Sequence, residues 1–338
     1  MFKAYSLEIT NRCNLRCVHC YFSDRYSALE MPYEKIIAVL EKNKYAQSVV
    51  VSGGEPFLHS QMDLILEYLS NIKGEVILIT NGTCISEKAY KTFENAPNIK
   101  FQISLDGSNA YTNSLVRTGC DFDTVIENIR ILAKIDSKRV VMRMTISKLN
   151  YKDVPSFYLL AESLGVAPSF LFAAKFGSAS VHWDKIQLSD SEKACVYSDV
   201  LMLNKKLGKQ IPPPDSIMHC SFLDNLVIGE GCSPTVDVNG NIYLCSYFPD
   251  YIVGNVFTDD IESIRNNKTY LQLKEQVRSW SREIALSRCK NCFFVDRCDQ
   301  GCYGKYIVNG RKEDDGDCGF RQYRYMINAI HTMQENNK

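Results

Sequence analysis

The sequence predicts an α/β protein in which a partial (β/α)6 TIM-like barrel is followed by a small cysteine-rich α+β domain. Three observations predict this class. Short β-branched runs alternate with longer amphipathic stretches through the first half of the 338 residues, a pattern typical of βαβ units and a parallel sheet. The alternation stops near three consecutive prolines at 212–214, which end a helix. Eight of the 14 cysteines lie beyond those prolines, among turn signals.

The barrel is expected to contain six strands, each a short apolar run that ends at turn residues. The strands are Ser6–Thr10, Ser48–Ser52, Glu75–Thr80, Lys100–Leu105, Val140–Ser147 and Ser169–Ala173. The expected helices between them are Pro32–Lys44, Gln61–Asn71, Glu87–Asn95, Asp123–Lys134 and Val154–Leu164. The carboxyl ends of parallel barrel strands meet on one face, where barrel active sites form.

The second half is expected to be poor in long helices after the prolines. Asn239-Gly240 is the dipeptide favoured in a tight β-hairpin. The elements expected here are a helix over Asp190–Leu207, hairpin strands over Thr235–Val238 and Ile242–Leu244, and an amphipathic helix over Arg321–Glu335. We therefore divide the chain into a barrel at 1–210, a cysteine-rich domain at 211–320 and a terminal helix at 321–338.

Composition excludes several classes of partner. Lys+Arg and Asp+Glu both number 39, so there is no basic excess of the kind that nucleic-acid binding requires. The sequence contains no apolar run of about 18 residues that would cross a membrane, and no signal peptide. We therefore expect a cytoplasmic protein that binds neither nucleic acid nor membrane. Disulfides are rare in that compartment, so regularly spaced cysteines indicate metal ligands or catalytic groups.

Cys13, Cys17 and Cys20 directly follow the first expected strand. Three thiolates on one short loop can bind three irons of a four-iron cluster and leave the fourth iron open to a ligand. The spacing alone is also compatible with zinc or with three unrelated cysteines. Structural zinc prefers four ligands, and His19 is the nearest candidate for a fourth.

This C-x3-C-x2-C loop resembles the signature of radical S-adenosylmethionine (SAM) enzymes. Further segments fall at the ends of the next three strands in the order of that family, namely Gly53-Gly54-Glu55-Pro56, Thr80-Asn81-Gly82-Thr83 and Ser104-Leu105-Asp106-Gly107. The resemblance covers roughly the first half of the chain. It implies a catalytic [4Fe-4S] cluster that reductively cleaves SAM to a 5′-deoxyadenosyl radical, which abstracts hydrogen from the substrate.

The same resemblance implies which residues contact the cofactor. The expected set is His19, Gly53, Gly54, Glu55, Asn81, Ser104 and Arg143. Paired glycines let the backbone come close to a ligand, and in the family this segment receives the methionine ammonium. Arg143 interrupts an apolar strand, so its side chain must point into a polar cavity or to solvent.

The cysteines of the second half resemble the SPASM extension, which binds two auxiliary [4Fe-4S] clusters in a subset of the family. The resemblance implies Cys220, Cys232, Cys245 and Cys302 for the first cluster and Cys289, Cys292, Cys298 and Cys318 for the second. A zinc ribbon is the alternative for this block. Three clusters account for eleven of the 14 cysteines, leaving Cys84, Cys120 and Cys195, the last expected in the core.

Most SPASM proteins of known activity modify ribosomally made peptides, so the resemblance implies a peptide or protein substrate and a C–S or C–C cross-link or other oxidation. The alternatives are a peptide epimerase, a formylglycine-type maturase, a radical enzyme acting on a small molecule, and a metal scaffold or electron carrier without catalysis. Epimerising relatives use a thiol, for which Cys120 is the candidate. The formylglycine branch carries an Asp where this chain has Ser246, which ranks that activity below cross-linking.

Two kinds of partner are implied besides the substrate. The catalytic cluster needs an electron donor such as a flavodoxin or a ferredoxin. The first strand begins almost at Met1, so no separate leader-binding domain is expected before the barrel. The leader of a leader-bearing substrate would then be bound by the barrel or by a separate leader-binding partner.

Overall fold

The computed structural model describes residues 2–23, 26–214, 233–245, 248–287, 289–295, 298, 301–308 and 318–336. A nine-stranded sheet runs through it in the order β11-β10-β9-β1-β3-β4-β5-β7-β8. Its parallel barrel strands are β1 (Ala4–Thr10), β3 (Ser48–Gly53), β4 (Glu75–Thr80), β5 (Ile99–Ser104), β7 (Val140–Ile146) and β8 (Ala167–Phe172). This arrangement confirms the predicted α/β class and the partial six-stranded barrel.

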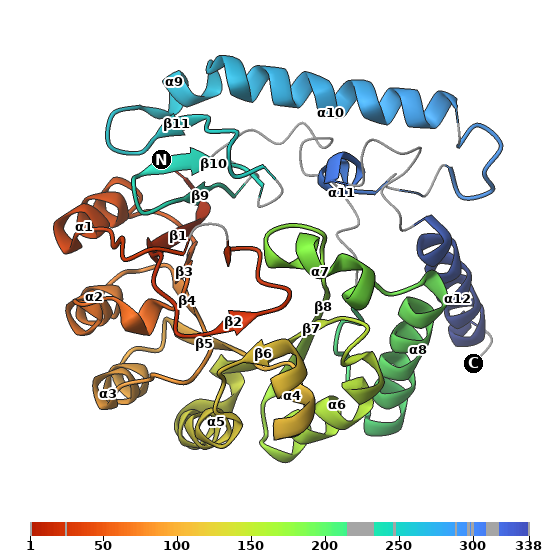
Figure 1. The fold of residues 1–338 in the computed structure, drawn as a ribbon, viewed down its shortest axis with the longest axis horizontal. Helices are drawn as coiled ribbons and strands as arrows, with labels where there is room; N and C mark the ends of the chain where they lie inside the picture. Colours follow the sequence, from red (N-terminus) through yellow and green to blue (C-terminus); the bar gives the residue numbers. More distant parts are fainter. Residues whose placement is uncertain are drawn as a thin grey trace.

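Helices cover the outer face of the sheet, while the loop after β1 lies on its inner side (Figure 1). The barrel helices are α1 (Tyr33–Lys42), α2 (Met62–Leu69), α3 (Glu87–Asn95), α4 (Ala110–Val116), α5 (Phe122–Asp136), α6 (Val154–Ser163), α7 (Ser178–Ile186) and α8 (Asp190–Leu207), with short 3-10 turns at Pro56–Leu58, Ser137–Arg139 and Tyr151–Asp153. Successive side chains of a strand point to opposite faces. In β5 and β7 the buried positions alternate with half-buried ones such as Ser104 and Arg143.

The cysteine-rich part extends the sheet of the barrel. β9 (Thr235–Val236) pairs in parallel with β1, and β10 (Asn241–Tyr243) folds back on β9 and pairs with β11 (Gly254–Asn255). Gly240 has φ +83° in the turn, so the predicted Asn-Gly hairpin is confirmed. The buried Tyr243 hydroxyl donates to the buried Glu8 Oε1 at 2.6 Å, which ties β10 to β1.

Two sequence expectations are wrong. The region beyond the prolines contains the 19-residue helix α10 (Lys268–Leu286), which lies across the top of Figure 1. Its buried residues recur at helical spacing, and the side chain of Asn267 caps it by accepting from Thr269 N and Tyr270 N. Cys195 is exposed on α8 and not in the core.

The remaining elements are α9 (Ile261–Arg265), α11 (Tyr303–Val308) and α12 (Cys318–Asn336). α12 begins three residues before the expected start and packs on α8, where Tyr197 Oη donates to Asn328 Oδ1 at 2.8 Å. Within the described residues, no helix combines the length and the apolar character needed to cross a bilayer.

Candidate active site

A cavity of about 220 Å³ lies at the carboxyl edge of the barrel strands. It brings together segments that are far apart in the sequence. Its lining includes Cys13, Cys17, His19 and Cys20 from the loop after β1, Gly53 and Gly54 at the end of β3, Asn81 after β4, Ser104 of β5 and Arg143 of β7. The three cysteines and every expected cofactor contact except Glu55 therefore line one cavity.

Arg143 reaches this cavity because β7 alternates its side chains between the two faces of the sheet. The side chain is half-buried, and Nε donates to Ser169 Oγ at 3.3 Å. Burial lowers the pKa of the guanidinium, but an arginine stays charged at physiological pH. No carboxylate of the described residues forms an ion pair with Arg143. A half-buried cation of this kind fits the carboxylate of an amino-acid ligand.

The two glycines are required by the packing of the cysteine loop against β3. A Cβ atom on Gly53, which has φ +139°, would lie 2.3 Å from Thr10 O, and one on Gly54 would lie 2.3 Å from Arg12 O. Gly54 N donates to Thr10 O at 2.8 Å. The absence of side chains thus lets β3 come close to the base of the loop and leaves backbone exposed to the cavity.

Glu55 does not line the cavity, although it contacts Asn81, which does. Its fully buried carboxylate accepts hydrogen bonds from Phe57 N at 3.1 Å, Thr80 Oγ1 at 2.7 Å and Asn81 N at 2.6 Å. Burial raises the pKa of Glu55, and the three hydrogen bonds oppose that shift. The observed geometry makes Glu55 a residue that orients the backbone of Asn81.

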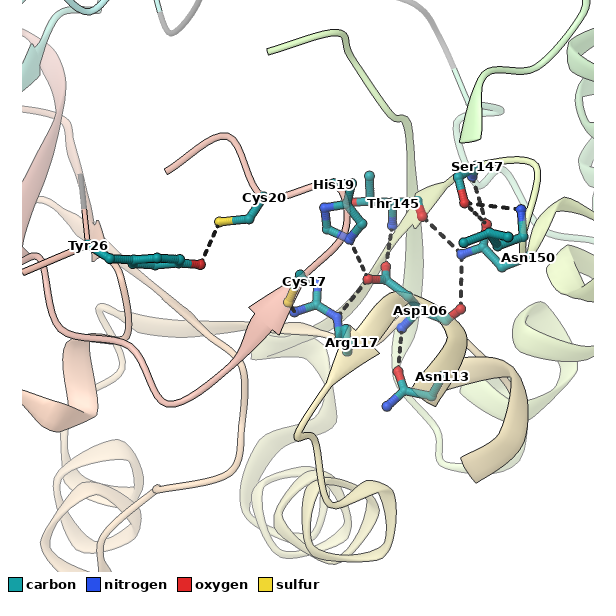
Figure 2. A network of polar contacts seen from close by, with 11 residues as sticks. Cys17, His19, Cys20, Tyr26, Asp106, Asn113, Arg117, Thr145, Ser147 and Asn150 are labelled. Carbon is teal, nitrogen blue, oxygen red and sulfur yellow. Dashed lines mark hydrogen bonds and ion pairs between the residues drawn. The ribbon is translucent and has the colours of Figure 1, made fainter. Parts of the chain in front are cut away.

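Sequence reasoning missed a buried network centred on Asp106 (Figure 2). The Asp106 carboxylate lies 2.6 Å from His19 Nε2 and 2.7 Å from Arg117 Nε, and it accepts from Thr145 N at 2.7 Å. Arg117 Nη1 in turn donates to Cys17 Sγ at 3.8 Å. Burial alone would raise the pKa of Asp106, but Arg117 and His19 outweigh burial and hold the pKa below its ordinary value.

Two short strands carry Arg117 to the cysteine loop. β2 (Arg16–Cys17) pairs antiparallel with β6 (Arg117–Thr118), which places Cys17 opposite Arg117. Strands of two residues leave no periodic pattern in a sequence. The one signal in the sequence is the segment Ser104-Leu105-Asp106-Gly107 at the end of β5, which contains the Asp106 of this network.

Further contacts hold the sulfur atoms and the end of the loop. Tyr26 Oη donates to Cys20 Sγ at 3.0 Å, and Leu15 N donates to Cys13 Sγ at 3.5 Å. Ser178 N, in the first turn of α7, donates to Cys20 O at 2.9 Å. Gly177 approaches so closely that a Cβ atom would lie 2.4 Å from Cys20 O. The loop is thereby fixed between β3, β6 and α7.

A second cavity, of about 30 Å³, lies between α10 and α12. It is lined by Cys289, Cys292, Cys298 and Cys318, the four cysteines expected to hold the second auxiliary cluster. For the other expected set, Cys245 follows β10 and Cys302 is buried directly before α11. Cys220 and Cys232 lie outside the described residues, as does Ser246.

Neither Cys120 nor Cys84 lines the cavity at the carboxyl edge of the barrel strands. Cys120 N donates to Arg117 O at 3.1 Å, and burial raises the pKa of its thiol. Cys84 Sγ accepts from Asn14 Nδ2 at 3.7 Å. Cys120 therefore lies beside the Asp106 network, and its thiol does not line the cavity.

Comparison with known families decides between the readings of these cysteines. The model of the radical SAM superfamily matches residues 7–161, and that of the SPASM iron-sulfur cluster-binding domain matches residues 229–293. This chain is a radical SAM enzyme with a SPASM domain. The resemblance found in the sequence is thus confirmed, and S-adenosylmethionine and iron–sulfur clusters are its cofactors.

Curated relatives of this radical SAM enzyme include two proteins that align over most of its length. It is 24% identical over 323 residues to mycofactocin maturase MftC of Mycolicibacterium smegmatis, covering 92% of this chain and 80% of the relative. It is 28% identical over 332 residues to Fe-coproporphyrin III synthase of Methanosarcina barkeri, covering 86% and 81%.

Solved structures share the fold of this radical SAM enzyme. Streptococcus suis SuiB bound to the precursor peptide SuiA superposes with a TM-score of 0.72 at 16% identity, over 93% of this chain and 74% of that chain. The protein anSMEcpe, with bound AdoMet and the Kp18Cys peptide, superposes with a TM-score of 0.72 at 16% identity, over 98% and 99%.

Proposed function

We propose that this radical SAM enzyme is a maturase that abstracts hydrogen from a peptide or protein and installs a C–S or C–C cross-link or another oxidation. One observation carries the proposal: the cavity where three cysteines of one loop meet two glycines and the half-buried Arg143. Its rim includes Tyr21 and Leu171, which are 37% and 36% exposed and available to an apolar part of the substrate.

The thiols, the glycine backbone and the guanidinium that line the cavity match the chemical groups of the two cofactors. Cys13, Cys17 and Cys20 would hold the cluster, Gly53 and Gly54 would admit the amino group of SAM, and Arg143 would pair with its carboxylate. When bound, the cluster and SAM together supply a carbon radical strong enough to break an unactivated C–H bond. The chain orients the bound molecules and excludes water from the cavity.

We also propose three [4Fe-4S] clusters, two of them in the SPASM domain. The second cavity supports one of them, because Cys289, Cys292, Cys298 and Cys318 all line it, together with apolar side chains and Arg321. The other would use Cys220, Cys232, Cys245 and Cys302. Ligation of iron requires reduced thiols, in keeping with the predicted cytoplasmic location.

We propose two protein partners. A flavodoxin or ferredoxin would supply the electron to the catalytic cluster, and a separate protein would bind the leader of a leader-bearing substrate.

A peptide substrate is supported by the relatives of the chain. One relative is named a maturase, and two proteins of the same fold were solved with peptides bound. A second candidate is a small-molecule substrate, which is favoured by the 28% identity to Fe-coproporphyrin III synthase. Epimerisation has less support, because Cys120 does not line the cavity.

The proposal is tested by anaerobic reconstitution with iron and sulfide, followed by reduction in the presence of SAM. We expect about twelve irons per chain, from three four-iron clusters, and release of 5′-deoxyadenosine. Replacing Cys13, Cys17 and Cys20 together by Ala should remove roughly a third of the iron and all SAM cleavage, because the auxiliary clusters keep their ligands. Cleavage that survives this substitution would place the catalytic cluster elsewhere.

Mass spectrometry of candidate substrates after turnover separates the two substrate classes. A peptide that loses two hydrogen atoms identifies an oxidising or cross-linking maturase, and an unchanged mass with an inverted centre identifies an epimerase. Turnover of a small molecule while peptides stay unmodified would contradict the peptide proposal.

A further inference from the structure

Arg117 lies between the sulfur of Cys17 and the carboxylate of Asp106 (Figure 2). Arg117 is 6% exposed and Asp106 is 0% exposed, so both charges are removed from water. The two form an ion pair at 2.7 Å between Arg117 Nε and Asp106 Oδ2. A buried cation that is held this firmly keeps one orientation, because breaking the pair would leave an uncompensated charge.

The orientation of Arg117 is determined on both sides. Asp106 also binds His19 Nε2 at 2.6 Å and Thr145 N at 2.7 Å, so its carboxylate is held between the cysteine loop and β7. The pairing of β2 with β6 sets Arg117 opposite Cys17 along the backbone. The Nε atom lies in an ion pair with Asp106, and the Nη1 atom of the same planar guanidinium donates to Cys17 Sγ at 3.8 Å.

The three sulfur atoms of the loop receive different donors. Cys13 Sγ accepts from the backbone N–H of Leu15 and Cys20 Sγ from the neutral hydroxyl of Tyr26. Among the described residues, Arg117 brings the one charged donor to a sulfur of this loop. Hydrogen bonds to cluster sulfurs and nearby charge are two of the properties that set the reduction potential of an iron–sulfur cluster.

We propose that Arg117 is a positioning residue that raises the reduction potential of the catalytic cluster through the sulfur of Cys17, and that Asp106 opposes it. The inference rests on the proposed function, because it requires a cluster at Cys13, Cys17 and Cys20. Reduction adds negative charge to the cluster, so a cation beside a ligand sulfur stabilises the reduced form. Asp106 lies behind the guanidinium and has the opposite charge, and the interior screens both charges far less than water does.

The experiment is a redox titration of the reconstituted full-length enzyme, followed by electron paramagnetic resonance. The signal of the catalytic cluster is recognised because addition of SAM changes it. In Arg117→Met, the ratio of reduced to oxidised catalytic cluster at a fixed potential should fall about tenfold, which is about 59 mV for a one-electron couple. In Asp106→Asn, which leaves the guanidinium unneutralised, the ratio should rise.

Three more variants complete the comparison. Arg117→Lys retains a cation and should lie between the wild type and Arg117→Met. If Arg117→Met fails to fold, the double variant Arg117→Met with Asp106→Asn replaces it, because it leaves no buried unpaired carboxylate. The ratio of reduced to oxidised cluster should also fall in the double variant. Arg12→Met removes an equal charge from the same loop, but Arg12 is 48% exposed, so screening by solvent should keep the change within about twofold.

Opposite shifts for the two single variants separate an electrostatic role from a loss of packing. The inference is wrong if Asp106→Asn and the Arg117 variants retain their iron and their SAM-dependent signal but leave the ratio of reduced to oxidised cluster unchanged. It is also wrong if all these variants shift that ratio in the same direction. In both cases the proposed function stands. If the wild type itself shows no signal that SAM changes, the proposed function fails.

Discussion

At the scale of single residues, Arg143 is the residue that we propose to bind the carboxylate of the cofactor. It is directed into the cavity by the alternation of β7 and has no carboxylate partner among the described residues. Arg143→Met should weaken SAM binding by about ten- to a hundredfold, since a hydrogen bond to a charged group contributes about 1.5–3 kcal/mol. Equilibrium binding of SAM to the reconstituted enzyme measures the loss.

Arg130→Met on the exposed face of α5 is the matched control, because Arg130 pairs with Glu127 at the surface and with no other carboxylate of the part of the chain that the structure describes. Its SAM affinity should equal that of the wild type. Equal affinity for both variants would remove Arg143 from the cofactor site.

Residues at the carboxyl ends of the barrel strands could be predicted from the sequence as one site, whereas the side chains that pack against those residues could not. The loop cysteines, Gly53-Gly54 and Arg143 were expected at one site and line one cavity. Arg117 is separated from Cys17 by 100 residues, and their contact depends on a ribbon of two-residue strands. Such a contact follows from tertiary packing and has no local signature.

At the scale of elements, the N-terminus of α7 closes over the end of the cysteine loop. A Cβ atom on Gly177, which has φ +56°, would lie 2.4 Å from Cys20 O. Gly177→Ala should therefore displace the loop and lower the iron content by up to about a third, the share of one cluster in three. Iron and sulfide analysis after reconstitution measures the effect.

Gly165→Ala is the control for Gly177→Ala. It introduces the backbone strain of a side chain at positive φ without a clash against another residue. Gly165 has φ +73° and no atom within 4 Å of its Cβ position. This variant should lose stability by about 1–2 kcal/mol but retain its full iron content. The prediction for Gly177 fails if both variants bind the same amount of iron.

Element prediction succeeded where periodicity and caps agreed. The expected bounds of β4, α3 and α8 coincide with the observed ones. α8 has Ser189 and Glu192 in a capping box and Gly208 in the left-handed conformation at its C-cap. The sequence did not predict α10, although Tyr270, Leu273 and Val277 recur at helical spacing. The cysteines and turn signals on both sides of this segment indicated loops instead.

At the scale of the whole molecule, the bond from Tyr243 to Glu8 joins the two domains inside the core. Tyr243→Phe removes a hydrogen bond to a buried carboxylate and should cost about 1.5–3 kcal/mol. The thermal midpoint, measured anaerobically by circular dichroism, should fall by several degrees. Tyr45→Phe is the control, since Tyr45 is 85% exposed and its hydroxyl is solvated. Equal midpoints for the two variants would contradict a stabilising role for the junction.

The shared sheet has a consequence for the edge of the barrel. β9 is hydrogen-bonded directly to β1 and so covers part of the edge of that strand. An uncovered strand edge carries unpaired N–H and C=O groups and is a template for pairing with another chain. The cysteine-rich part therefore protects this edge of the barrel against association with a second molecule.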